Sequence, residues 1–344
     1  MSSDFENAGD IEARKNHHLD LCLDADVESH AVRGGFASLA FEHQALPELD
    51  LDAVDTRTKL FGRELKAPFV IGAMTGGTQR AGEINAILAE AAAECGVGMA
   101  LGSQRVMIER PETASSFRTA VRPPLRIGNL GAVQLNYGVE RDQVLRLIED
   151  SELDVLALHL NPLQEGIQPE GDTRFSGLVK KMGDLIPTLP VPVLVKEVGA
   201  GISAATARQI LSTGAAGIEV AGVGGTSWAA VEGFRGGAKN RRAGEVFRDF
   251  GIPTVESLRA CHAVAPQLTL VASGGLRSGL DGAKAIALGA DAFAMSRPLL
   301  EATRDGVEGV VELISCLIRE LRIAMFCTGS ASLEDLRRQR LSPR

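Results

Sequence analysis

The chain has 344 residues, of which 45% are hydrophobic and 4% aromatic, and its formal net charge is −8. The acidic balance argues against nucleic-acid binding, which needs a basic surface, and no uninterrupted apolar run is long enough to span a bilayer. The length suits one elaborated α/β barrel, and the scarcity of aromatic residues disfavours an all-β sandwich.

The first residues, 1–15, are acidic and lack an apolar stretch, so we expect neither a signal peptide nor a membrane anchor. The cysteines show no CxxC spacing and read as reduced core thiols; they are Cys22, Cys95, Cys261, Cys316 and Cys327. We therefore expect a cytoplasmic protein.

Residues 1–65 precede the first expected strand and are predicted to form an N-terminal extension. From residue 66, short apolar runs alternate with segments of helical periodicity. The expected strands are 67–74, 97–101, 125–130, 153–160, 191–198, 217–222, 268–274 and 291–296. Because these runs are apolar on both faces, they suit parallel strands covered by helices.

Eight such units predict an α/β fold, a (β/α)₈ TIM barrel over residues 66–329, with a doubly wound sheet as the alternative. Residues 306–329 are expected to form the closing helix, and residues 330–344 a basic, solvated tail.

Polar residues recur where the expected strands end, which is where barrel enzymes place catalytic groups. They include Thr75, Ser103, Arg105, Asn129, His159, Asn161, Gln164, Glu165, Lys196 and Thr226. Any one of them could be a helix cap or an ordinary loop residue. Their recurrence at strand after strand favours a functional site.

A phosphate site is predicted after the seventh and eighth strands. Gly274, Gly275 and Arg277 follow the seventh strand, and Arg297 follows the eighth. Backbone amides, a helix N-terminus and an arginine can together hold a phosphate, although a plain glycine-rich turn is the alternative. The site fits FMN, with the MTGG sequence and Asn129 beneath the ring.

Lys196 lies inside an otherwise apolar strand, so burial should disfavour its charge or require an anion beside it. Glu197 is its neighbour, but adjacent residues of a strand point to opposite faces. We therefore expect a flavin or a substrate anion to be the partner of Lys196.

The sequence HLNPLQE brings together His159, Asn161, Gln164 and Glu165. One carboxylate with two amides and an imidazole is a poor zinc site but suits Mg²⁺ that is also held by water and a substrate phosphate. The alternative, a solvated loop acid, stays open for Glu165.

The N-terminal sequence EARKNHHLD places Arg14, Lys15 and His18 close together. They read either as the solvated start of a basic helix or as a diphosphate clamp from this subunit or a neighbour.

Taken in order, RKNHHL, MTGG, GSQR, HLNPLQE, PEGDTRF, VKEVGAGIS, GGTSW and SGGLRSG resemble the type 2 isopentenyl-diphosphate isomerases, from residue 14 to residue 298. The resemblance implies an FMN barrel that interconverts isopentenyl and dimethylallyl diphosphate. It also implies Mg²⁺, a reduced flavin with NADPH as reductant, no net redox change and a homo-oligomer.

The resemblance also implies roles for individual residues. FMN would be held by Ala73, Met74, Thr75, Ser103, Asn129, Lys196, Thr226, Gly274, Gly275, Arg277, Ala294 and Met295. The substrate would be held by Arg14, Lys15, His18, Arg105, His159, Asn161 and Gln164. Gln164, Lys196 and His159 would be catalytic and Glu165 would bind the metal. Whether His17 or His18 faces the ligand stays open.

Three rival functions are disfavoured. An α-hydroxy-acid oxidase needs a histidine beside an arginine near strand seven, and LVASGGLRSG has no histidine. An inosine-monophosphate-dehydrogenase-like enzyme needs a cysteine after strand six, and GVGGTSW has none. A non-catalytic flavin-binding regulator could lose HLNPLQE and Lys196, which are both present.

Overall fold

The computed structural model describes residues 8–30 and 34–344. Parallel strands form a closed barrel in which the last strand pairs with the first. In chain order they are β4 (Phe69–Ile71), β5 (Gly98–Ala100), β6 (Leu125–Gly131), β7 (Val155–Leu160), β8 (Val193–Glu197), β9 (Gly217–Glu219), β10 (Thr269–Ala272) and β11 (Ala292–Met295). Closure confirms the predicted (β/α)₈ barrel and rules out the doubly wound sheet. Each strand lies within a predicted run and is shorter than it, except β6, which extends one residue beyond the predicted run 125–130.

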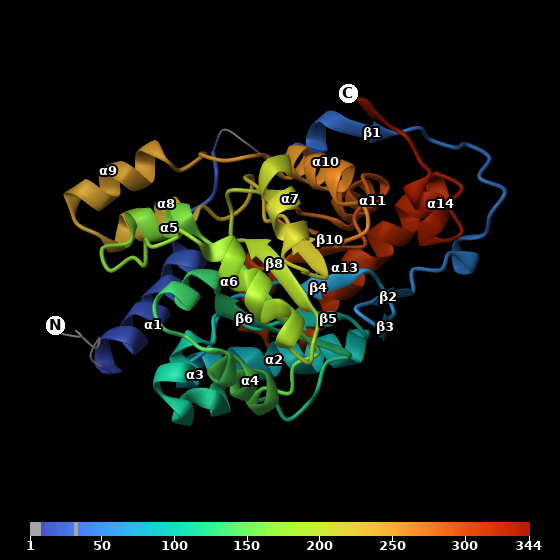
Figure 1. Ribbon diagram of the computed structural model, residues 1–344. Helices are drawn as coiled ribbons and strands as arrows, with labels where there is room; N and C mark the ends of the chain where they lie inside the picture. The colour runs from blue at the N-terminus through green and yellow to red at the C-terminus, as the bar shows by residue number, and fades with distance from the viewer. Residues whose placement is uncertain (1–7, 31–33) are drawn as a thin grey trace.

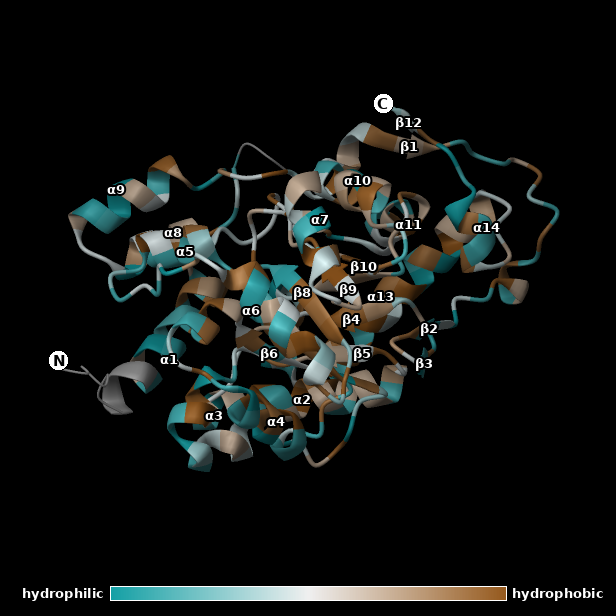
Figure 2. Cartoon of the chain, viewed as in Figure 1, coloured by the Kyte–Doolittle hydropathy of each residue, from teal (hydrophilic) through white to brown (hydrophobic). Residues whose placement is uncertain are grey.

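The strands are apolar on both faces because one face lines the barrel and the other packs against helices. Figure 2 shows brown along the barrel strands, whereas the surrounding helices carry both brown and teal residues. The register aligns His159 with Lys196, and Lys196 with Glu219, on three successive strands. Three polar side chains are thereby brought to the same level of the barrel.

The helices that cover the barrel include α2 (Gln79–Cys95), α4 (Arg141–Asp150), α6 (Leu178–Leu185), α7 (Ala204–Ser212), α10 (Thr254–Val264), α11 (Gly279–Ala287) and α13 (Gly306–Cys327). Further helices in the loops that follow the strands include α3 (Arg105–Glu109), α5 (Pro162–Ile167), α8 (Trp228–Arg235), α9 (Ala238–Val246) and α12 (Arg297–Ala302). Hydroxyl side chains cap several N-termini: Thr78 accepts from the amide of Ala81, and Ser278 from that of Asp281. The long helix α13 lies within residues 306–329, the segment in which the sequence analysis expected a helix.

A hairpin from the N-terminal region plugs one end of the barrel. It consists of β2 (Thr58–Leu60) and β3 (Arg63–Leu65), and its Leu60 and Leu65 are buried in one cluster with the barrel residues Ile127 and Val155. Figure 1 shows this hairpin on the side of the barrel opposite helix α1 (Ala8–Asp24). With this end of the barrel filled, the described residues leave the cavity at the C-terminal ends of the strands for a ligand.

The predicted tail, residues 330–344, is more ordered than expected. It contains helix α14 (Leu333–Arg337), with Leu336 fully buried, and strand β12 (Leu341–Pro343), which pairs with β1 (Leu39–Phe41). The prediction of a solvated tail is right for the exposed Arg337 and Arg338 but wrong for the apolar residues, which cover the barrel beside α11.

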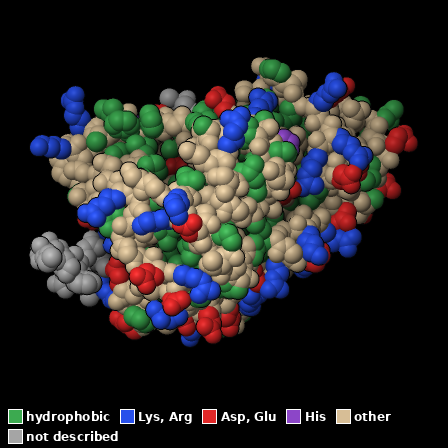
Figure 3. Space-filling view, in the orientation of Figure 1, with side chains coloured by type: hydrophobic (Ala, Val, Ile, Leu, Met, Phe, Trp, Pro, Cys, Tyr) green, Lys and Arg blue, Asp and Glu red, His purple; other side chains and the backbone are tan. Residues whose placement is uncertain are grey.

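No helix in the described residues is long and apolar enough to cross a membrane. Residues 1–7, on which part of the signal-peptide expectation falls, lie outside the described residues. Lys and Arg side chains intermingle with Asp and Glu over the face drawn in Figure 3.

Candidate active site

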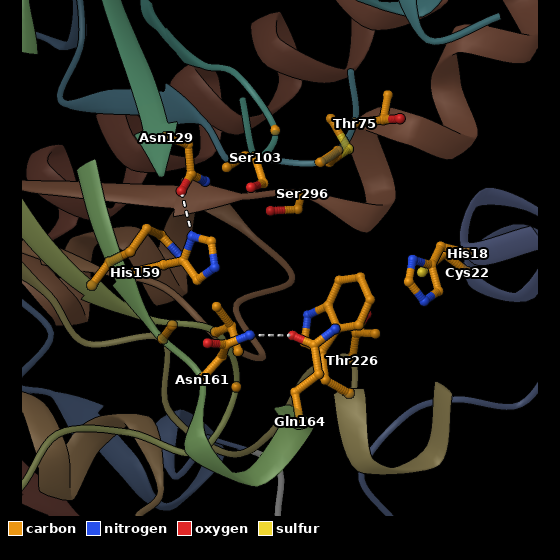
Figure 4. Close-up of a pocket in the computed structure, with 18 of the residues that line it drawn as sticks. His18, Cys22, Thr75, Ser103, Asn129, His159, Asn161, Gln164, Thr226 and Ser296 are labelled. Atoms are coloured by element: carbon orange, nitrogen blue, oxygen red, sulfur yellow. Dashed lines mark hydrogen bonds between the residues drawn. The ribbon is translucent and has the colours of Figure 1, made fainter. Parts of the chain in front are cut away.

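Every residue that the sequence predicted for the site lines one cavity, of about 290 Å³, at the C-terminal ends of the barrel strands. These residues are Arg14, Lys15, His18, Ala73, Met74, Thr75, Ser103, Arg105, Asn129, His159, Asn161, Gln164, Glu165, Lys196, Thr226, Gly274, Gly275, Arg277, Ala294 and Met295. Figure 4 shows several of them converging from different strands and from the α1 side.

The glycines after β10 form a cradle that leaves no room for side chains. Gly274 and Gly275 have φ of 97° and 76°, in the region that favours glycine. A Cβ on Gly275 would lie 2.5 Å from the backbone of Gly224, and one on Gly274 would overlap the carbonyl oxygen of Gly222. The two loops are thus in backbone contact at the edge of the cavity, as a close-fitting phosphate site requires.

Two arginines flank this cradle, and a carboxylate that the sequence did not predict partly balances their charge. Arg277 donates to Glu28 Oε1 at 2.8 Å, and Arg297 lies 3.4 Å from the same oxygen. Glu28 comes from the segment that follows α1, and its backbone bridges to Thr226. The cavity therefore has a cationic end whose charge is already partly balanced.

An uncharged histidine forms part of the cavity wall. His159 Nδ1 lies 2.7 Å from Asn129 Oδ1, drawn as a dashed line in Figure 4. Burial, helped by the Lys196 charge, lowers the pKa of His159 to about 3. Since the amide oxygen only accepts, Nδ1 carries the proton and Nε2 keeps a lone pair.

Lys196 is not paired in the predicted way. Its Nζ lies 3.5 Å from Glu219 Oε1 and donates to the backbone carbonyl oxygen of Glu197 at 2.6 Å. The Glu197 carboxylate turns away and accepts from the amides of Val198, Gly199 and Ala200, as strand alternation predicts. The anion beside Lys196 is thus Glu219, and the expectation of a ligand anion as its partner needs correcting.

Helix α1 contributes the cations at the outer end of the cavity. Lys15 Nζ donates to the carbonyl oxygens of Gly76 and Ser103, the latter at 3.3 Å. Burial, with the Arg14 charge, lowers the pKa of Lys15 to about 7. Arg14 lies 3.4 Å from Glu170. His17 is exposed, whereas His18 lines the cavity, so His18 is the histidine that faces inward.

His18 and Gln164 meet at a buried acid that the sequence did not single out. Glu232 of α8 has no exposed side-chain surface, lies 3.1 Å from His18 Nε2 and accepts from Gln164 Nε2 at 2.9 Å. Burial opposes its ionisation, but these hydrogen bonds and the Arg235 charge leave the pKa of Glu232 lowered. The sequence signal that could have identified Glu232 is an acidic residue among apolar ones, in WAAVEGF.

Gln164 and Glu165 stand on the short helix α5 rather than on the predicted loop. Glu165 accepts from Asn161 Nδ2 at 2.8 Å and from the backbone amide of Asp172 at 2.7 Å, and burial raises its pKa. Asp172, also missed by the sequence analysis, forms an ion pair with Arg105 at 2.6 Å. These contacts fix Glu165 with one face toward the cavity.

The oxygen atoms here suit a cation that needs ligands from elsewhere as well. Asn161 Oδ1 is buried and has no hydrogen-bond partner, although the Nδ2 of the same side chain serves Gln164 and Glu165. Within residues 8–30 and 34–344, no group of three or more His, Cys, Asp or Glu side chains could hold a metal. A metal with few protein ligands, completed by water and phosphate oxygens, fits this donor set.

The histidines that line the cavity are His18 of α1 and His159 of β7, and neither belongs to the loop that follows the seventh barrel strand, β10. An oxidase that abstracts a proton with a histidine near strand seven is therefore not supported by the geometry.

A family model for FMN-dependent dehydrogenases matches residues 10–122 and 172–343. The segment between these two matches carries Asn129, His159, Asn161, Gln164 and Glu165. The matched residues themselves include most of helix α1 and the glycine cradle at Gly274 and Gly275.

Several full-length relatives are named isopentenyl-diphosphate delta-isomerase. The relative from Synechococcus sp. is 51% identical over 328 residues, which cover 94% of each chain. The relative from Stutzerimonas stutzeri is 48% identical over 333 residues, which cover 96% of each chain. The relative from Nostoc sp. is 45% identical over 334 residues, which cover 96% of this chain and 95% of its own.

Solved structures of mandelate oxidase share the fold. One with (S)-2-phenylpropionate has a TM-score of 0.68 at 22% identity and covers 98% of this chain and 99% of its own. A variant with a monooxide FMN adduct has a TM-score of 0.67 at 21% identity, covering 94% and 95%.

Proposed function

Since this chain belongs to the isopentenyl-diphosphate delta-isomerase family, within the FMN-dependent dehydrogenase family, we propose that it interconverts isopentenyl and dimethylallyl diphosphate without net redox change. The observation that carries the proposal is a single cavity that combines a glycine phosphate cradle at one end with Arg14, Lys15 and Arg105 at the other. Two anionic groups, the phosphate of a flavin and the diphosphate of a substrate, can thus occupy separate ends.

The residues fit FMN. Gly274, Gly275 and Arg277 would hold its phosphate, and Thr75, Ser103, Asn129, Lys196 and Thr226 would contact the rest, together with Ala73, Met74, Ala294 and Met295. When bound and reduced, the flavin would supply an electron-rich ring that stabilises positive charge on the substrate and exchanges protons with it.

The protein's own part is to bind and orient the diphosphate. Burial lowers the pKa of Lys15 to about 7, so a diphosphate that enters would favour the protonated form of its Nζ. Arg105, held by Asp172, offers its remaining N–H groups, and Arg14 adds a further charge. The Nε2 lone pair of His159 can accept a hydrogen bond from a donor but repels a bare phosphate oxygen.

Gln164 would orient the isoprenoid end of the substrate. Its amide is fixed between Asn161 and Glu232, and Glu232 also holds His18. In its ionised form Glu232 accepts on Oε1 from Gln164 and lies within hydrogen-bond distance of His18, so it fixes the orientation of both side chains. Gln164, Lys196 and His159 are our candidates for direct contact with the reacting groups.

We further propose that Mg²⁺ binds at Glu165 and Asn161 Oδ1, with water and diphosphate oxygens completing its shell. The unpartnered buried oxygen of Asn161 supports this assignment. NADPH as reductant, a homo-oligomer and a cytoplasmic location are proposals that rest on the resemblance and, for the location, on five free cysteines. The extension, residues 1–65, would contribute to the substrate clamp of the 66–329 barrel through the α1 residues Arg14, Lys15 and His18.

Anaerobic conversion of isopentenyl diphosphate tests the function. The purified protein is incubated with Mg²⁺ and FMN, with and without NADPH or dithionite. Dimethylallyl diphosphate should form only with reductant, and the reductant should not be consumed in proportion to product. If the protein binds FMN and the added reductant reduces it, but no dimethylallyl diphosphate forms, the isomerase function is refuted.

A further inference from the structure

The buried ion pair between Lys196 and Glu219 has a chemical consequence for any flavin held by Lys196. Both side chains are only 8% exposed, and both line the cavity. Glu219 stands on β9 in register with Lys196 on β8, so the backbone itself fixes the pair at the strand ends. Neither group is free to turn into solvent.

Ser273 completes the arrangement. Its Oγ donates to Glu219 Oε1 at 2.8 Å from the end of β10. The Glu197 carboxylate is bound by three backbone amides and is not among the residues that line the cavity, and His159 is neutral, so Glu219 is the acid that faces the cavity beside Lys196. The cavity wall therefore presents one ammonium and one carboxylate, not an isolated cation.

We propose that Glu219 is a positioning residue for the reaction: its carboxylate offsets the Lys196 charge and so keeps the reduced flavin electron-rich. The proposal rests on the proposed function, because it assumes FMN beside Lys196. A flavin gains electron density on reduction, so a lone cation beside it favours the reduced form, and a carboxylate in the same dry environment opposes that effect.

An isomerase needs this balance for a specific reason. The reduced flavin must remain a good proton acceptor and must stabilise positive charge on the substrate. An unopposed lysine would make the flavin easier to reduce but would draw electron density away from the reacting groups. Glu219 thus favours basicity of the reduced flavin over ease of reduction.

The test is the midpoint potential of bound FMN, measured by anaerobic titration against a reference dye, alongside the affinity for oxidised FMN. Glu219→Gln should strengthen binding of reduced over oxidised FMN at least tenfold, a rise of about 30 mV for a two-electron couple. Turnover of isopentenyl diphosphate should fall, although the flavin is easier to reduce. Glu219→Asp, which keeps the charge, should restore both values.

Glu28→Gln is the matched control. It removes the same charge from the cavity, but at the arginines of the phosphate cradle. The flavin phosphate does not change charge on reduction, so this variant should alter the affinity for both flavin forms equally and leave the potential unchanged.

Ser273→Ala provides a second, independent variant if Glu219→Gln loses its flavin. It keeps both charges but removes the hydrogen bond that disperses the carboxylate charge, so the potential should not rise. An unchanged or lower potential in Glu219→Gln, or a rise in Ser273→Ala, would overturn the role of Glu219. Failure of the unaltered protein to bind FMN would instead refute the proposed function.

Discussion

The lowered pKa of Lys15 makes substrate capture sensitive to pH. The ammonium form attracts the diphosphate, and in the free protein burial brings the pKa of this side chain to about 7. The protonated fraction is about one half at pH 7 and about one tenth at pH 8. Because kcat/KM reports the ionisation of the free enzyme, it should be level below pH 7, fall by up to tenfold per pH unit above it, and level off where the Lys15 charge is lost.

The effect on kcat should be smaller, because a bound diphosphate favours the charged form of Lys15. Replacing Lys15 by Met removes a charge-assisted hydrogen bond of about 1.5–3 kcal/mol, which corresponds to a loss of roughly 10- to 150-fold in kcat/KM. Lys15→Arg keeps a positive charge at every accessible pH, so its alkaline decline should disappear.

The assay is the initial rate of isomerisation of isopentenyl diphosphate by the reduced protein between pH 6 and pH 10. Lys180→Met is a matched control, because Lys180 is exposed on α6 and pairs only with the exposed Asp184. Its pH profile should equal that of the unaltered protein. An alkaline decline that persists in Lys15→Arg, or one centred near the ordinary lysine value, would refute the assignment.

Three further predictions concern the metal, the flavin and the barrel plug. Glu165→Gln puts an amide nitrogen against one of the donors, Asn161 Nδ2 or the Asp172 amide, that the carboxylate accepts from. Mg²⁺-dependent turnover should therefore fall by roughly two orders of magnitude while the protein stays yellow. Unchanged turnover would remove Glu165 from the mechanism. Gly275→Ala should lower FMN affinity in a fluorescence titration. Gly138 also has a positive φ but has open space around it, so Gly138→Ala should not lower that affinity. Equal losses of FMN affinity in the two variants would mean that backbone strain alone is responsible. Leu60→Ala should lower the free energy of unfolding in urea by about 2–5 kcal/mol, and Leu46→Ala, whose residue is 82% exposed, should have little effect.

The sequence was sufficient to predict the barrel and most of the cavity wall, because both depend on short-range patterns. An apolar run buried on two faces indicates a parallel strand whatever its neighbours are, and the C-terminal ends of such strands must meet at one rim. Lys196, His159 and Gly275 could be placed there for that reason alone. The alternation of side chains along β8 also correctly separated Lys196 from Glu197.

Partners across strands and helices were decided only by the tertiary structure. Glu219 lies 23 residues after Lys196, and its sequence surroundings look like those of any strand acid; the barrel register makes the two a pair. Glu232 reaches His18 across 214 residues because α8 packs against α1. Local periodicity carries no information about such distances, since the energy of burying a charge depends on which group comes to lie beside it.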